Sequence, residues 1–188
     1  INALMIYIKK DTNVLHLTYA GSASSVSVSL GSSTYRWYHV CATYINNTLG
    51  FYVNGTFMGQ INGTFGSSGF MLGSAGTSVA QAYSGYIDDF RIYHRILNPA
   101  EIAFLANQNA VYPGLPLSYN LGIYMPMEGN LTDTSGKNVV VTGTGTMQYP
   151  YTSVIGTRCL YLQNNTPVAN STAATNYVTA PYTFPNAF

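Results

Sequence analysis

The sequence predicts an all-β protein, an antiparallel β-sandwich with one short helix near residues 99–107. Three observations lead to this prediction. Most of the 188 residues form short runs rich in Val, Ile, Leu and Tyr, which are separated by clusters of Gly, Asn and Ser. An Asn-Gly pair lies between two such runs, as in a tight hairpin. One stretch, which begins at Asn98, carries the signals of a helix start.

The first strands are expected at residues 3–8, 14–19 and 26–30, because turn residues lie between these runs. Residues 37–44 follow as a strand whose alternate side chains point to opposite faces. Both faces of this strand are fairly apolar, which is typical of a strand in the middle of a sandwich.

The clearest local signal is the predicted hairpin of residues 49–53 and 56–59. Asn54 and Gly55 lie between these two strands, and this pair supplies the two positive φ angles that a type I′ turn requires. After the hairpin, the Gly- and Ser-rich stretch 63–76 is expected to be a loop with a short apolar segment inside it.

A strand expected at residues 86–93 leads to the predicted helix. Asn98 can cap the helix, Pro99 suits its first turn, and Glu101 can reach back to the cap in a capping box. The helix is expected to run from about residue 99 to residue 107.

The motifs between Arg36 and Glu101 carry a family resemblance. They read WYHVCATY, then YVNG, then GYIDDFRIYHRILNPAEI. This stretch resembles the second half of a laminin-G-like jelly roll of the concanavalin A-like superfamily, with its W-x-H-V, Y-V-N-G and G-x-I-D-D-x-R-I-Y segments. The resemblance implies a jelly-roll sandwich, a core position for Trp37, and a packing role for His39.

Later segments of the chain resemble the opening strands of the same family. They read LGIYMPMEGNLTDTSG, GTRCLYLQ and NYVTAP. The resemblance therefore runs in permuted order. We expect residues 1–108 to be the back half of one jelly roll, 109–117 a linker, and 118–188 the front half of the next, as in a piece of a tandem array. The alternative is one circularly permuted sandwich over residues 1–188.

Composition excludes two classes of partner. Only 7% of residues are charged and the net charge is +1, against roughly 25% charged residues in an average soluble domain. Seven scattered Lys and Arg residues cannot form a phosphate-tracking patch, so nucleic acid is not an expected partner. No apolar run is long enough for a membrane-spanning helix. Weak repulsion between copies favours association with other copies or neighbouring domains.

Six N-x-S/T motifs suit a glycosylated protein at an extracellular, cell-surface or virion location. The same motifs also arise by chance in a chain this rich in Asn, Ser and Thr. They begin at Asn46, Asn54, Asn62, Asn130, Asn164 and Asn170.

Catalysis is not expected. Glycoside hydrolases use a pair of carboxylates across the scissile bond, and this chain has only two glutamates. Glu101 lies at a helix start and Glu128 in a turn, so they do not form such a pair. His16, His39 and His94 lie on different predicted strands without a triad or metal-binding spacing.

Calcium is the candidate cofactor. Asp88 shares a face of its predicted strand with Phe90 and Ile92, where a bare carboxylate would be costly. It either accepts backbone N–H groups and fixes a loop, or binds calcium as the family resemblance implies. Asp133 is the second candidate ligand, with an Asx turn as its alternative.

The cysteines and tyrosines leave their roles open. Cys41 and Cys159 lie in apolar runs and are either buried thiols or a mutual disulfide. The 17 tyrosines are mainly sheet formers, although some could stack on sugar rings. The sequence thus predicts a non-catalytic structural or adhesive module. The alternative is a lectin-like carbohydrate-binding module, which could depend on calcium.

Overall fold

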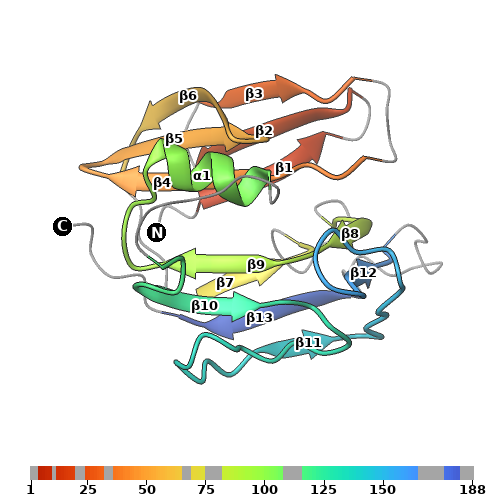
Figure 1. Ribbon diagram of the computed structural model, residues 1–188. Helices are drawn as coiled ribbons and strands as arrows, with labels where there is room; N and C mark the ends of the chain where they lie inside the picture. Colours follow the sequence, from red (N-terminus) through yellow and green to blue (C-terminus); the bar gives the residue numbers. More distant parts are fainter. Residues whose placement is uncertain are drawn as a thin grey trace. The chain divides into compact units, whose positions relative to one another are not determined.

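The computed structural model describes residues 4–9, 12–19, 24–31, 36–64, 69–74, 82–107, 116–164 and 176–182 (Figure 1). It confirms an all-β protein with one short helix, and the strands that it pairs are antiparallel. The elements are β1 (Leu4–Lys9), β2 (Val14–Tyr19), β3 (Val26–Ser29), β4 (Val40–Ile45), β5 (Thr48–Val53), β6 (Thr56–Asn62), β7 (Gly69–Leu72), β8 (Gly85–Ile87), β9 (Phe90–Tyr93), α1 (Pro99–Ala106), β10 (Leu121–Met125), β11 (Thr142–Thr144), β12 (Leu160–Leu162) and β13 (Tyr177–Pro181). None of the described helical residues forms a segment long and apolar enough to cross a membrane.

The chain divides into two compact units. Unit 1 contains residues 1–67, 95–119 and 185–188, and unit 2 contains residues 68–94 and 120–184. Each unit has its own hydrophobic core.

Unit 1 is built from strands that are neighbours in sequence. One sheet has the order β1-β2-β3 and the other the order β4-β5-β6. Their inward side chains form one apolar cluster, because alternate residues along each strand face the same side. Its buried members are Leu15, Leu17, Leu49, Phe51, Val53 and Ile61.

The hairpin between β5 and β6 confirms the predicted Asn-Gly turn. Asn54 and Gly55 have φ angles of 49° and 80°. Asn54 Oδ1 also accepts the backbone N–H of His39 at 3.0 Å. Strand β4 begins at Val40, so the predicted start at Trp37 lies outside it. The Trp37 side chain is 38% exposed. The expected core position of Trp37 is therefore wrong, because the residue precedes the strand that would carry it inward.

Helix α1 confirms the predicted capping box. Asn98 Oδ1 accepts the Glu101 N–H at 3.0 Å, and Glu101 Oε2 accepts the Asn98 N–H at 2.8 Å. Glu101 is buried, and its Oε1 lies 2.7 Å from Nη2 of Arg95. Arg95 also donates from Nε to the carbonyl of Tyr119 at 3.0 Å. Arg95, which precedes the helix, is thus bonded both to Glu101 at the helix start and to Tyr119 after the helix.

Unit 2 is built from strands far apart in sequence. Its ladders pair β9 with β10, β8 with β12, and β13 with both β7 and β11. A second apolar cluster lies between these ladders. Its buried members are Ile123, Met125, Met127, Leu160, Leu162, Val178 and Tyr182.

The predicted strand 86–93 is broken in the structure. Asp89 has a φ of 53°, so the extended backbone ends there and β8 and β9 enter different ladders. The alternation of side chains does not continue through the break. The loop predicted at residues 63–76 also contains a short strand, β7, which pairs with β13.

These pairings bear on the expected domain boundaries. Strands β7, β8 and β9 lie in unit 2 with residues 121–182, whereas β1 to β6 lie in unit 1. The β9–β10 ladder joins a segment of the expected back half to a segment of the expected front half. Residues 108–115, which include most of the expected linker, lie outside the described residues. Division at 108 and 118 stays a prediction.

Candidate functional site

Unit 2 contains four of the six acidic residues of the chain. They are Asp88 and Asp89, directly after β8, and Glu128 and Asp133, in the segment between β10 and β11. Each makes hydrogen bonds within the protein. The partners of these bonds decide what chemistry the carboxylates can perform.

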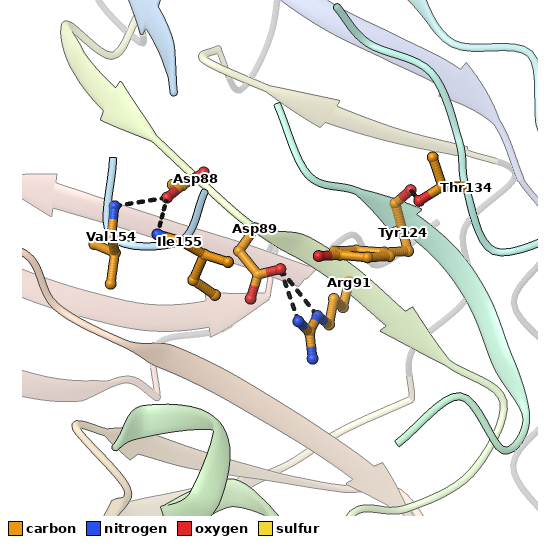
Figure 2. A network of polar contacts seen from close by, with 7 residues as sticks. All are labelled: Asp88, Asp89, Arg91, Tyr124, Thr134, Val154 and Ile155. Carbon is orange, nitrogen blue, oxygen red and sulfur yellow. Dashed lines mark hydrogen bonds and ion pairs between the residues drawn. The ribbon is translucent and has the colours of Figure 1, made fainter. Parts of the chain in front are cut away.

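Asp88 fixes the loop that precedes β12. Its Oδ2 accepts the backbone N–H groups of Val154 and Ile155 at 2.8 and 3.0 Å (Figure 2). Its Oδ1 is buried without a hydrogen bond. Burial raises the pKa of Asp88, although the N–H donors oppose the rise.

Asp89 is paired with Arg91 two residues later. Arg91 donates from Nε and Nη2 to Asp89 Oδ1 at 3.1 and 2.9 Å, and its guanidinium lies 4.6 Å from the ring centroid of Tyr124. Figure 2 shows the three side chains together. Burial raises the pKa of Asp89 even though the Arg91 charge favours the carboxylate.

Glu128 accepts hydrogen bonds from the same loop as Asp88, at residues 157–158 instead of 154–155. It accepts the Thr157 N–H at 2.9 Å, the Thr157 hydroxyl at 2.8 Å and the Arg158 N–H at 3.4 Å. The bonds from Thr157 lower the pKa of Glu128. Gly156 has a φ of 72°, and a side chain there would collide with the Glu128 carboxylate. Residues 154–158 are therefore held by two carboxylates from different strand ends.

Asp133 joins β10 to the turn that follows. Its Oδ1 accepts the N–H groups of Tyr124 and Ser135 at 3.0 and 2.9 Å. Its Oδ2 accepts the Ser135 hydroxyl and the Val139 N–H, both at 3.0 Å. Burial would raise the pKa of Asp133, but these donors outweigh it and the pKa lies below its ordinary value. The bond from Ser135 N–H is the Asx turn considered as the alternative to calcium binding.

The two calcium candidates differ in how well they fit a cation. Calcium takes six to eight oxygen ligands. Both oxygens of Asp133 already accept two hydrogen bonds each, so this residue does not fit. Asp88 retains one oxygen, Oδ1, without a hydrogen bond. Within the described residues no three His, Cys, Asp or Glu side chains come together as a metal cluster. Asp88 and Asp133 serve separate loops.

The structure also shows a surface that was not predicted, which we call the tyrosine row: Tyr86, Tyr161 and Gln148. Tyr86 lies opposite Tyr161 in the β8–β12 ladder, and their ring centroids are 4.8 Å apart. Gln148 bridges to Tyr161 on its other side. The sequence pattern did not reveal the row, because its members come from three segments between residues 85 and 162.

The six sequons differ in accessibility. Asn46, Asn54, Asn62 and Asn130 are exposed, and Asn170 lies outside the described residues. Asn164 is only 8% exposed. Its Nδ2 donates to the carbonyls of Tyr83 and Asn176 at 2.9 and 2.8 Å. The side chain of Asn164 is therefore part of the unit 2 scaffold.

The two cysteines and two of the histidines can be placed in the described structure. Both thiols are free, and burial raises the pKa of Cys41 to about 11 and that of Cys159 in the same direction. His16 bonds to the Ser27 hydroxyl at 2.8 Å, and His94 contacts the Tyr182 hydroxyl. These side chains belong to separate elements.

Comparison with known proteins gives one match. A laminin G model, described as the concanavalin A-like lectin/glucanases superfamily, matches residues 2–103. The matched residues are more than half of the chain and include the motifs from Arg36 to Ile102. No curated protein and no solved structure matches the chain significantly.

Proposed function

Because the chain belongs to the concanavalin A-like lectin/glucanases superfamily, we propose that it is a non-catalytic structural or adhesive module. We place it in an extracellular, cell-surface or virion assembly, as part of a tandem array. The partners are other copies or neighbouring domains of the same protein. Laminin G-like domains are generally non-catalytic binding modules, but this superfamily also hosts glucanases, so the argument rests on this chain's residues.

Both glutamates are bonded to other groups of the protein, which supports a non-catalytic role. Glu101 is buried in an ion pair with Arg95, and Glu128 accepts three hydrogen bonds from residues 157–158. A glycoside hydrolase needs two carboxylates that face one bond of the substrate. These two lie in different units and hold the backbone in place.

The open edge at β1 is the observation that carries the assembly proposal. Ile6 lies opposite Leu17 and Ile8 opposite Leu15, so the four side chains share the core face of the sheet. Leu15 and Leu17 are buried, whereas Ile6 and Ile8 are 43% and 40% exposed. Among the described strands β1 pairs only with β2. An apolar edge strand of this kind is a template for pairing with another strand.

A strand from a second copy suits this edge. The only charge on β1 is Lys9 at its end. If two β1 strands pair antiparallel with Tyr7 opposite Tyr7, Ile6 lies opposite Ile8 and Lys9 lies opposite Met5. No like charges then meet, and each copy covers the other's exposed isoleucines. The net charge of +1 adds little repulsion.

Sedimentation velocity over a range of concentrations tests the assembly. We expect the chain to self-associate reversibly and Ile6→Lys to be monomeric, because a charge on the inner face of an edge strand blocks pairing. Val140→Lys, at an exposed apolar loop position, is the control and should associate like the wild type. A wild type that stays monomeric, or an Ile6→Lys variant that associates equally well, would reject β1 pairing.

A lectin-like carbohydrate-binding module is the second candidate. The tyrosine row favours it, because exposed aromatic rings beside an amide are suited to binding sugars. Calcium would contribute through Asp88 Oδ1, since Asp133 is saturated. If the melting temperature is the same in calcium and in EGTA, calcium has no part in the folded protein.

A further inference from the structure

We propose that the ring of Tyr7 determines which strand pairs with β1, because it stacks on an aromatic ring that the partner strand places beside it. In a second copy of the chain that ring is Tyr7 itself. This inference rests on the proposed assembly through β1. It adds to that assembly the side chain that fixes the register and the kind of strand that the edge accepts.

Tyr7 is the last member of a row that crosses one face of the sheet. Ser27, His16 and Tyr7 lie opposite one another on β3, β2 and β1. Leu15 and Leu17, on either side of His16, are buried in the unit 1 core, so the row lies on the opposite face. The Ser27 hydroxyl and His16 Nδ1 are 2.8 Å apart, and this bond orients the imidazole.

The row ends in a ring stack that a further ring can extend. The Tyr7 and His16 rings are stacked, with centroids 5.0 Å apart and planes inclined by 13°. Neighbouring strands of a sheet are about 5 Å apart, so a strand added at the edge places its side chains one step further along the row. Tyr7 is 41% exposed, and the ring face turned away from His16 lies on the side of this edge. An aromatic residue on the added strand would therefore stack on Tyr7.

The backbone of β1 supports the same register. Leu30 donates its N–H to the carbonyl of Asn13 at 3.0 Å, so the backbone groups of Asn13 point to β3. The direction alternates along an antiparallel strand, and the groups of His16 therefore point to β1, where they pair with Tyr7. The residues on either side of Tyr7 present their N–H and C=O groups at the open edge.

A two-fold axis through this edge places Tyr7 of one copy opposite Tyr7 of the other. Ile6 and Ile8 of the two copies then exchange backbone hydrogen bonds, and the tyrosines form a non-hydrogen-bonded pair with Cα atoms about 4.5 Å apart. Side chains are closest at such pairs, so the row continues across the interface. Parallel pairing in register would instead place Lys9 beside Lys9, which is unfavourable.

The other aromatic pair of unit 1 is arranged differently. Phe57 and Tyr52 also lie on neighbouring strands, with centroids 5.2 Å apart, but their planes are inclined by 60°. Both rings extend over Gly50, where an added Cβ would meet them at 3.6 Å. This pair covers a glycine of its own sheet. Phe57 is 50% exposed, so it provides a matched control for Tyr7.

Disulfide trapping tests the register. Met5, Tyr7 and Lys9 share one face of β1, and each is replaced by cysteine in a Cys41→Ala chain, where Cys159 is fully buried. Tyr7→Cys should form a disulfide-linked dimer, because Cα atoms about 4.5 Å apart suit a disulfide. Met5→Cys and Lys9→Cys should each stay unlinked, whereas a mixture of the two should cross-link. Linkage of Met5→Cys to itself would show parallel pairing and overturn the register.

Sedimentation velocity tests the ring. Tyr7→Thr should weaken self-association about 10-fold, because Thr keeps strand propensity but removes the stacked ring. Tyr7→Phe should associate like the wild type, since it keeps the ring. Phe57→Thr, which removes an exposed ring elsewhere in unit 1, should also leave association unchanged. Circular dichroism of each variant checks that the fold is retained.

The outcomes separate the ring from the assembly. If the wild type associates, Ile6→Lys is monomeric and Tyr7→Thr associates as tightly as the wild type, β1 pairing stands and the role of Tyr7 is rejected. Absence of the Tyr7→Cys dimer in that case would reject the register. A wild type that is monomeric at every concentration would reject the assembly itself, and the Tyr7 contact with it.

Discussion

Units 1 and 2 contain similar numbers of strands but are held together differently. In unit 1 every ladder joins strands that follow each other in the sequence, and the turns are short. In unit 2 every ladder joins segments that are separated along the chain. The acidic residues follow the same division. Between Asp11 and Asp88 the chain has no Asp or Glu, whereas unit 2 has four.

This difference shows two ways of fixing loops in an all-β protein. Unit 1 uses turn residues and hairpins, whose effect is local. Unit 2 uses carboxylates that accept backbone N–H groups across large sequence separations, such as Asp88 with Val154, 66 residues away. A carboxylate that accepts several N–H bonds is strongly stabilising but depends on the rest of the unit being folded.

The largest effect is expected from Glu101→Ala, which tests whether unit 1 is held only by local signals. Removing the carboxylate leaves the buried guanidinium of Arg95 without its ion pair and opens the capping box. We expect a loss of about 4 kcal/mol in the free energy of unfolding. Urea denaturation measures it, and Arg95→Met with Glu101→Leu is the control that removes both charges. A Glu101→Ala loss below about 1 kcal/mol would show that the pair is not needed.

Asp133→Ala tests the corresponding clamp of unit 2. Four hydrogen bonds to one carboxylate are lost, and we expect the free energy of unfolding to fall by about 3 kcal/mol. Asp133→Asn keeps one acceptor oxygen, so its free energy of unfolding should fall by less. Hydrogen exchange by mass spectrometry should show faster exchange in β10 and residues 134–139, with β5 unchanged. Equal loss of protection in both units would contradict their independence.

Gly55→Ala tests the local turn. Gly55 has a φ of 80°, and an added Cβ would lie 3.0 Å from Ala103 Cα. We expect a loss of about 1 to 2 kcal/mol, measured by thermal unfolding, because a left-handed backbone is costly for alanine. Gly136→Ala, also at positive φ but in open space, separates the backbone cost from the contact with the helix.

Acid should weaken unit 2 before unit 1. The pKa of Asp133 is lowered from 3.8, so its contribution is present above pH 3.8 and is lost as the pH falls through the lower folded value. The pKa of Glu128 is lowered from 4.5 and acts in the same direction. The pKa values of Asp88 and Asp89 are raised from 3.8, so their ionisation destabilises the folded protein as the pH rises above 3.8. Hydrogen exchange followed as the pH falls from 5 to well below 3.8 should expose residues 121–139 first. Asp133→Asn should reduce this acid sensitivity, and an unchanged profile would refute the assignment.

The smallest effect on stability concerns the sequons. In protein secreted from eukaryotic cells we expect a glycan on the exposed Asn130 and none on Asn164 in the folded fraction. A glycan on the Asn164 Nδ2 replaces one of its two N–H groups, so at least one of the bonds to the Tyr83 and Asn176 carbonyls would be lost. Mass spectrometry after enzymatic deglycosylation measures the occupancy of each site. Comparable occupancy of Asn164 would show that its buried bonds are dispensable.

The candidate site was predictable only in part. Asp88 was identified from the sequence because a carboxylate on an apolar strand face needs a partner, and Asp133 was identified as a second calcium candidate or an Asx-turn residue. The N–H donors to Asp88 come from Val154 and Ile155, which no local pattern connects to it. Glu128 was taken for a turn residue, since its partners at 157–158 are also distant.

The sequence by itself determined the elements whose signals are local. The Asn54-Gly55 turn, the capping box from Asn98 to Glu101 and the strand pattern of β1 to β6 all depend on residues within a few positions of each other. Only the tertiary structure decided the break at Asp89, the grouping of β7 to β9 with β10 to β13, and the tyrosine row. The physical reason is that these features arise from contacts between segments far apart in the chain, whose energies no short window of sequence contains.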